Sequence, residues 1–134
     1  MPRAATRSKK GLFEIRVRTH FSAAHHLRGY PGACANPHGH NWEIEVAMRG
    51  RTLDRTGFLI DFQDVRRGVR DVLAQLDHAD LNVLPDFAAE NPTSEHIARH
   101  LYRALARRLD GAGRRVCRVT VCETPGAQAS YTEE

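Results

Sequence analysis

The sequence predicts an α+β fold in which a four-stranded antiparallel sheet carries two helices on one face. Apolar residues alternate with polar ones in four segments, which is the period of a half-buried strand. In two other segments they recur every three or four residues, which is the period of an amphipathic helix. The segments follow in the order β-β-α-α-β-β. Two hairpins and two helices imply one sheet with its helices on one side.

The first two strands frame a long loop. Residues 12–21 alternate, with Phe13, Ile15 and Val17 on the inner face. Residues 22–39 are rich in Gly, Pro and His without periodicity, which predicts a loop, and loops of that length usually carry function. Alternation returns from His40. The inner residues of this second strand are Trp42, Ile44, Val46 and Met48.

Two helices follow. Asp61 is expected to cap a helix that ends near Asp77-His78. Asn91-Pro92 is read as the N-cap and first residue of the second helix, which Gly111 to Gly113 end. The apolar positions of the first helix are Phe62, Val65, Val69, Val72, Leu73 and Leu76, and those of the second are Ile97, Leu101, Leu105 and Leu109.

The last two strands are predicted over residues 115–123 and 127–131, joined by a Pro125-Gly126 turn. Cys117, Val119 and Val121 share one face of the first of them with Glu123. A four-stranded sheet leaves two long edges and an open face. Oligomerisation would cover both, so we expect a homo-oligomer.

Length and charge indicate one domain over residues 11–134 behind a basic, disordered tail over residues 1–10. The 134 residues suffice for a single core. The net charge of +4 comes from Arg3, Arg7, Lys9 and Lys10, because the remaining chain has 16 basic and 16 acidic residues. A neutral body disfavours nucleic acid as a partner, although a nucleic-acid-binding arm or tRNA-binding module remains an alternative for the tail.

Hydropathy and cysteine content indicate whether the protein enters a membrane and in which redox compartment it works. No segment approaches the ~20 apolar residues of a membrane span, and no apolar signal segment opens the chain, so no membrane partner is expected. The three cysteines, Cys34, Cys117 and Cys122, are an odd number without a Cys-x-x-Cys motif. Free thiols of this kind favour the reducing cytoplasm over a disulfide framework.

The segment from Cys34 to Trp42 predicts a metal site. His38 and His40 point to the same side of a strand, because side chains alternate with a period of two. A third imidazole comes from His25 or His26, between which spacing cannot choose. Three imidazoles hold Zn²⁺ with one coordination position open, which is typical of catalytic zinc.

Cys34 has two alternative roles. As a fourth ligand it would close the site and make it structural. As a thiolate favoured by the nearby cation it would act as a base or nucleophile. A Gly- and Pro-rich loop is a poor place to bury an inert thiol, whereas Cys117 and Cys122, in a strand, are read as inert.

Two further carboxylates could carry chemistry. Asp77 could orient the imidazole of His78 and raise its basicity, or His78 could simply face the end of the helix dipole. Glu123 could bind two N–H donors of a flat heterocycle, or lie solvated at a strand end.

Taken together, the motifs resemble one family, that of 6-pyruvoyl-tetrahydropterin and 6-carboxytetrahydropterin synthases. The resemblance runs from about Leu12 to Tyr131. The motifs are Phe-Ser-Ala-Ala-His, Cys-x-x-x-His-Gly-His-Asn-Trp, Leu-Asp-His-x-x-Leu-Asn, Asn-Pro-Thr-Ser-Glu and Val-x-Glu-Thr, in the family's order.

The resemblance implies a tunnelling fold whose subunits pool their strands in a barrel, usually a hexamer built as a dimer of trimers. It implies Zn²⁺ as cofactor and a small-molecule pterin as substrate. The implied zinc ligands are His25, His38 and His40. The implied catalytic residues are Cys34, as proton acceptor, with Asp77 and His78, while Glu123 anchors the pterin and Thr93 and Glu95 line its pocket.

The three-residue spacing between Cys34 and His38, and the Asn-Trp after His40, resemble the bacterial carboxy branch. That branch converts 7,8-dihydroneopterin triphosphate to 6-carboxy-5,6,7,8-tetrahydropterin, with loss of acetaldehyde and triphosphate, in 7-deazaguanine and queuosine biosynthesis. The alternatives are the pyruvoyl branch and, from another class, a non-catalytic zinc-stabilised interaction domain.

Overall fold

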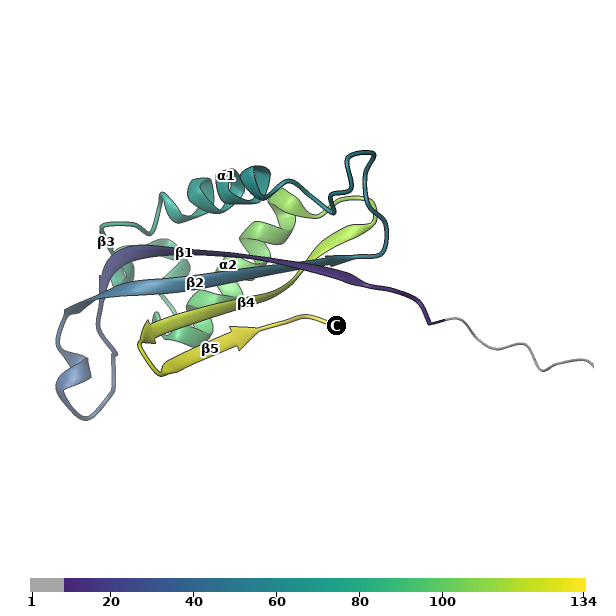
Figure 1. The fold of residues 1–134 in the computed structure, drawn as a ribbon. Helices are drawn as coiled ribbons and strands as arrows, with labels where there is room; N and C mark the ends of the chain where they lie inside the picture. Colours follow the sequence, from purple (N-terminus) through teal and green to yellow (C-terminus); the bar gives the residue numbers. More distant parts are fainter. Residues whose placement is uncertain (1–8) are drawn as a thin grey trace, which may run out of the picture.

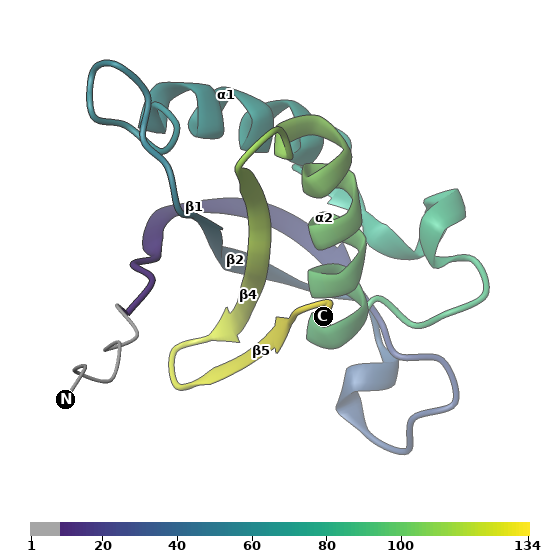
Figure 2. The ribbon, with the colours of Figure 1, turned by 90° about the vertical axis from the view of Figure 1, so that its right-hand side faces the viewer.

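A computed structural model describes residues 9–134, and in it one sheet carries two helices on one face (Figures 1 and 2). The strands lie in the order β3-β1-β2-β4-β5. All neighbours are antiparallel except β3, which is parallel to β1. The elements are β1 (Phe13–His25), β2 (His38–Gly50), α1 (Phe62–Leu73), β3 (Ala79–Asp80), α2 (Ser94–Leu109), β4 (Arg114–Thr124) and β5 (Ala127–Tyr131), with three 3-10 turns, η1 (Ala33–Ala35), η2 (Leu81–Val83) and η3 (Pro85–Phe87).

The predicted α+β class and element order are confirmed, but the sheet has five strands instead of four. The additional strand, β3, is only two residues long and pairs with Ala23 and Ala24 of β1. A two-residue strand has no periodicity, so the sequence pattern could not reveal it.

The predicted loop over residues 22–39 was too long. β1 continues to His25 and β2 begins at His38, so that only residues 26–37 connect them. Residues 22–25 pair with residues 38–41 in unbroken register. Backbone pairing therefore extends the hairpin through a segment of small side chains that showed no clear alternation.

The helices differ from prediction at their ends. Asp61 caps α1 as expected, its side chain accepting a hydrogen bond from Gln63 N, but α1 ends at Leu73. The N-cap of α2 is Thr93 and not Asn91, because the Thr93 side chain accepts a hydrogen bond from His96 N. The predicted inward orientation is wrong for Phe13 and Phe62, which lie at the ends of their elements and are 47% and 50% exposed.

One core joins the helices to the inner face of the sheet. Trp42, Leu101 and Val119 are fully buried within it. The two helices approach closely at Gly68, where an added Cβ would lie 2.8 Å from the Leu109 side chain. In the part of the chain that the structure describes, no helix covers the opposite face of the sheet (Figure 2), and charged side chains on that face line a hollow of about 920 Å³.

The sequence also predicts a basic N-terminal tail and no segment long enough to span a membrane. Of the predicted tail over residues 1–10, residues 1–8 lie outside the described residues, while Lys9 and Lys10 are exposed and belong to no helix or strand. Neither helix within residues 9–134 combines the length and the apolar run that a membrane span requires.

On the uncovered face, Glu14 ties three strands together. Its carboxylate accepts hydrogen bonds from Arg49 Nε of β2 at 2.7 Å, from Arg16 Nε of β1 at 2.6 Å and from Arg118 Nη2 of β4 at 3.3 Å. These bonds, that of Arg49 most of all, lower the pKa of Glu14 from 4.5 to about 2. The ionised carboxylate therefore stabilises the folded chain.

We predict that Glu14→Gln lowers the free energy of unfolding at pH 7 by about 1–2 kcal/mol, a value reduced for solvent screening of a surface cluster. Because the folded-state pKa is lowered, the contribution is present above about pH 4.5 and is lost as pH falls towards 2. Urea unfolding of both proteins over this range measures the difference. Glu43→Gln, on the same face, is the control, and a difference that did not shrink on acidification would contradict the assignment.

Candidate functional site

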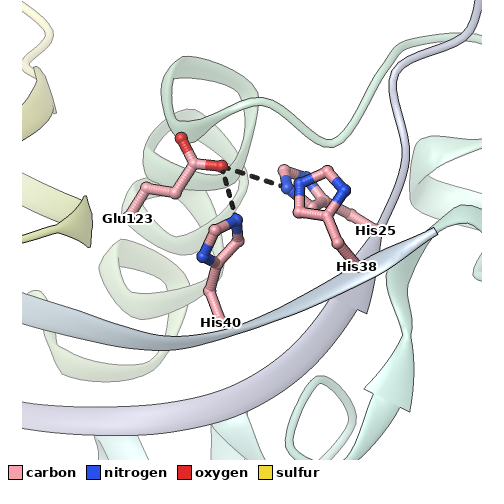
Figure 3. A group of neighbouring side chains, drawn as sticks. All are labelled: His25, His38, His40 and Glu123. Carbon is pink, nitrogen blue, oxygen red and sulfur yellow. Dashed lines mark ion pairs between the residues drawn. The ribbon is translucent and has the colours of Figure 1, made fainter. Parts of the chain in front are cut away.

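The site lies at the end of the sheet where β1 ends and β2 begins. His25 pairs with His38, and Ala23 pairs with His40. Since side chains alternate along each strand, all three imidazoles point to the helix-covered face that also holds Trp42. Figure 3 shows the three rings converging there.

A carboxylate from β4 completes the group. Cys122 pairs with Glu43, whose side chain is on the uncovered face, so the next residue, Glu123, points to the helix side. Glu123 Oε1 lies 3.1 Å from His25 Nε2 and 3.0 Å from His40 Nε2 (Figure 3). One ligand atom each from His25, His38, His40 and Glu123 lies within 4.8 Å of all the others, so this group could hold a metal ion.

Backbone carbonyls determine the tautomers of two rings. His25 Nδ1 is 2.8 Å from Pro92 O, and His38 Nδ1 is 2.8 Å from Asn36 O. A carbonyl oxygen only accepts hydrogen bonds, so each Nδ1 carries the proton and, in the neutral ring, each Nε2 carries a lone pair. Metal-ligating histidines are typically held in this way by a bond from the second ring nitrogen.

The burial of these nitrogens tests whether the group fits a cation. His25 is 2% exposed, and burial lowers its pKa, which favours the neutral ring. Its Nε2 lone pair then faces a carboxylate oxygen, an arrangement that is repulsive without a positive charge between them. Within residues 9–134, neither His25 Nε2 nor His40 Nε2 has a hydrogen-bond partner, although both atoms are buried. A metal ion would satisfy them, and nitrogen with oxygen donors suits Zn²⁺.

Trp42 packs against two of the imidazoles. Trp42 is fully buried, and its ring meets those of His25 and His40 edge-on, with centroids 4.9 and 5.3 Å apart. Its Nε1 donates a hydrogen bond to Ala23 O at 3.2 Å. Packing of this kind restricts the ring rotamers and prepares the group to bind an ion.

Asp77 and His78 form the predicted pair, held by β1. Asp77 Oδ1 lies 3.1 Å from His78 Nδ1 and accepts a hydrogen bond from Ser22 N at 2.9 Å. The bond from Ser22, followed by the contact with His78, lowers the pKa of Asp77. His78 N donates to Ser22 O, and His78 has a φ of 60°, a strained conformation that clusters at functional sites. His78 and His40 line one open hollow of about 490 Å³.

The other predicted site residues surround the group without joining it. Cys34 is exposed in η1, within the loop that leads to His38. Thr93 caps α2 and Glu95 is exposed in its first turn, directly after the Pro92 carbonyl that holds His25. His26, the alternative to His25, is not in the group. The fourth potential ligand is Glu123, for which the sequence predicted substrate binding, and not Cys34.

Sequence reasoning missed the carbonyl groups of Asn36 and Pro92. Every residue has a carbonyl, so no residue type marks these two as partners of an imidazole.

Fold and site define an α+β protein with a candidate metal centre of three imidazoles and a carboxylate. The family model for 6-pyruvoyl tetrahydropterin synthase matches residues 14–134, and the chain therefore belongs to that family of pterin synthases. This confirms the family that the motifs indicated.

Individual relatives come from both branches. A 6-carboxy-5,6,7,8-tetrahydropterin synthase of Bacillus subtilis is 33% identical over 126 residues, covering 89% of this chain and 84% of the relative. A 6-pyruvoyl tetrahydrobiopterin synthase of Poecilia reticulata is 32% identical over 103 residues, covering 66% and 70%. The structure of Caenorhabditis elegans 6-pyruvoyl tetrahydropterin synthase superposes with a TM-score of 0.82 at 26% identity, covering 96% of this chain and 100% of the other, which confirms the tunnelling fold.

We predict that His25→Ala and His38→Ala each abolish stoichiometric zinc binding, because two imidazoles cannot hold the ion as three do. His20→Ala, on the uncovered face, is the matched control and should retain zinc. Elemental analysis of the dialysed proteins measures the zinc content. Retention of a full equivalent of zinc by both site variants would place the ion elsewhere.

Proposed function

We propose that this chain converts 7,8-dihydroneopterin triphosphate to 6-carboxy-5,6,7,8-tetrahydropterin, with loss of acetaldehyde and triphosphate, in a zinc-dependent reaction. The observation that carries the proposal is the pair of buried Nε2 atoms of His25 and His40 that lie about 3 Å from a carboxylate oxygen without a hydrogen bond, that of His25 with a lone pair towards it. The Bacillus subtilis relative and the spacing between Cys34 and His38 support the carboxy branch.

His25, His38 and His40 would hold the zinc ion. When bound, it would act as a Lewis acid on the side-chain oxygens of the substrate and acidify the adjacent C–H bond. The carbonyls of Pro92 and Asn36 keep two of the imidazoles in the tautomer that leaves Nε2 free for this role.

Proton transfer is assigned to Cys34 and His78. Cys34 stands exposed in the loop before His38, where its thiolate could take a proton from the substrate side chain. His78 would return protons, with Asp77 holding its Nδ1. The hydrogen bond that Asp77 accepts from Ser22 keeps it ionised, so it can stabilise a protonated imidazole.

Glu123 is assigned to the pterin ring. A cation bound to the imidazoles would either be coordinated by Glu123 as well or leave the Glu123 carboxylate free to bind the substrate. Glu123 is 34% exposed, so it can reach two parallel N–H donors of a pterin, a geometry that a carboxylate accepts bidentately. Thr93 and Glu95, at the start of α2, would line the same pocket.

Oligomerisation is part of the proposal. Within residues 9–134, β3 pairs with only two residues of β1, and β5 pairs on one side only. Edges of this kind attract a further strand, which supports strands pooled between subunits. A hexamer built as a dimer of trimers is the arrangement that the family resemblance implies. Three free cysteines agree with action in the cytoplasm. The resemblance to the carboxy branch supports a place in 7-deazaguanine and queuosine biosynthesis.

The second candidate is the pyruvoyl branch, which the Poecilia reticulata relative favours. A non-catalytic, zinc-stabilised domain is less well supported. It would need Cys34 as the fourth ligand, whereas the group of potential ligands contains Glu123.

Incubation of the zinc-loaded protein with 7,8-dihydroneopterin triphosphate tests the reaction. Acetaldehyde together with the mass of the carboxypterin is the expected result. Triphosphate release with the mass of a pyruvoylpterin would move the chain to the other branch. No turnover with zinc bound would contradict both.

We predict that Cys34→Ala retains zinc and lowers kcat by about 10²–10⁴-fold, the usual contribution of a general base. Steady-state kinetics and zinc analysis of the same sample measure the two properties. Loss of zinc would identify Cys34 as a ligand, and near-normal turnover would remove it from catalysis. Cys122→Ala, at a thiol on the uncovered face, is the matched control.

We predict that Glu123→Gln retains zinc and raises KM about tenfold or more, because a charged hydrogen-bond partner of the pterin is lost. A KM titration with a parallel zinc analysis distinguishes the two roles. A zinc-free variant would show that Glu123 binds the ion instead.

A further inference from the structure

Among the described residues, no strand pairs with the chain beyond His25, and the one backbone bond there runs from Leu27 N to Cys34 O at 2.8 Å. β1 and β2 stop pairing at His25 and His38, and the next three residues, 26–28, enter the loop. Two asparagine side chains take the place of a neighbouring strand along this stretch. Both lie in the sequence motifs, Asn82 in Leu-Asp-His-x-x-Leu-Asn and Asn91 in Asn-Pro-Thr-Ser-Glu, and neither has a role in the mechanism above.

Asn82 holds the residue directly after His25. Its Oδ1 accepts a hydrogen bond from His26 N at 2.8 Å, and its Nδ2 donates one to His26 O at 3.1 Å. The amide thus pairs with the backbone of His26 as another strand would. Asn82 is itself fixed within η2, because its backbone N donates to the Asp80 side chain.

Asn91 pairs in the same way with the backbone of Arg28, two residues further along the chain. Its Oδ1 accepts from Arg28 N at 2.9 Å and its Nδ2 donates to Arg28 O at 3.0 Å. The Arg28 side chain in turn donates to the carbonyl oxygens of Phe87, Ala88 and Glu90. Both the backbone and the side chain of Arg28 therefore bind to the segment of residues 87–91.

These contacts close a ring through the site. From His25 the chain runs to Arg28, crosses to Asn91 through the paired amide bonds, and continues to Pro92, whose carbonyl accepts from His25 Nδ1. The position of Pro92 O relative to His25 determines where Nε2 points. Removal of the Asn91 amide leaves only the Arg28 side chain to make this crossing, and removal of the Asn82 amide frees the backbone next to His25.

We propose that Asn82 and Asn91 are positioning residues of the metal site, which set the orientation of the His25 ring and hence the affinity for zinc. The proposal rests on the proposed function, because it requires that His25 binds the ion. Neither asparagine touches the ion or the substrate in this role. Loss of a direct hydrogen-bond partner of a metal ligand typically changes metal affinity by about 10–100-fold, and the two asparagines hold such a partner and the backbone next to the ligand in place.

The test is the zinc dissociation constant of the full chain, measured by competition with a chromophoric chelator, for Asn82→Ala and Asn91→Ala. We expect each to bind zinc about 10–100-fold more weakly than the wild type. With Co²⁺ in place of zinc, the ligand-field absorption bands should shift as well, since the geometry at His25 changes. Asn91→Asp keeps the acceptor for Arg28 N but loses the donor to Arg28 O, and should show a smaller loss.

Asp61→Ala is the matched control for stability. It removes the side chain that caps α1 by accepting from Gln63 N, so it should destabilise the fold while leaving the zinc affinity unchanged. Should an alanine variant fail to fold, Asn82→Asp and Asn91→Asp decide the question.

Folded asparagine variants that bind zinc within about twofold of the wild type, with an unchanged Co²⁺ spectrum, would overturn the positioning role alone. A folded wild-type chain that binds no zinc would overturn the proposed metal site and the positioning role together.

Discussion

The register in which β1 pairs with β2 is the constraint on which the site depends. With His25 opposite His38 and Ala23 opposite His40, three imidazoles reach one face of the sheet. A slip of one residue would send His38 and His40 to the uncovered face, because side chains alternate. The buried Trp42 opposes Phe21 in the same register, so the core that stabilises the sheet also prevents the slip.

Burial gives the site its chemistry. A histidine as buried as His25 is favoured in its neutral form, and the Pro92 carbonyl directs its remaining lone pair towards Glu123. The resulting contact between electron-rich atoms is stable only around a cation. The same helix-side packing holds the end of β4, so a group assembled from three strands depends on the fold as a whole. Cys34 and His78, to which we assign proton transfer, are by contrast exposed, where a substrate could reach them.

Much of this could be predicted from the sequence. The two-residue period placed His38 and His40 on one side, and the helix period found both helices. What failed were features that depend on distant partners. The Asn91 amide suits an N-cap, but it binds Arg28, and Thr93 caps α2 instead. His25 could not be chosen over His26 by spacing, because the choice depends on pairing that continues through Ala24. The approach of Glu123 to the histidines required the register of β4.

The central claim is an open zinc site made by three imidazoles and no thiolate. X-ray absorption at the zinc edge of the loaded protein tests it most directly. The account predicts a first shell of nitrogen and oxygen only, at about 2.0–2.1 Å, with the outer-shell pattern of three imidazoles. A sulfur at about 2.3 Å would contradict it, since Cys34 would then be a ligand and the site closed.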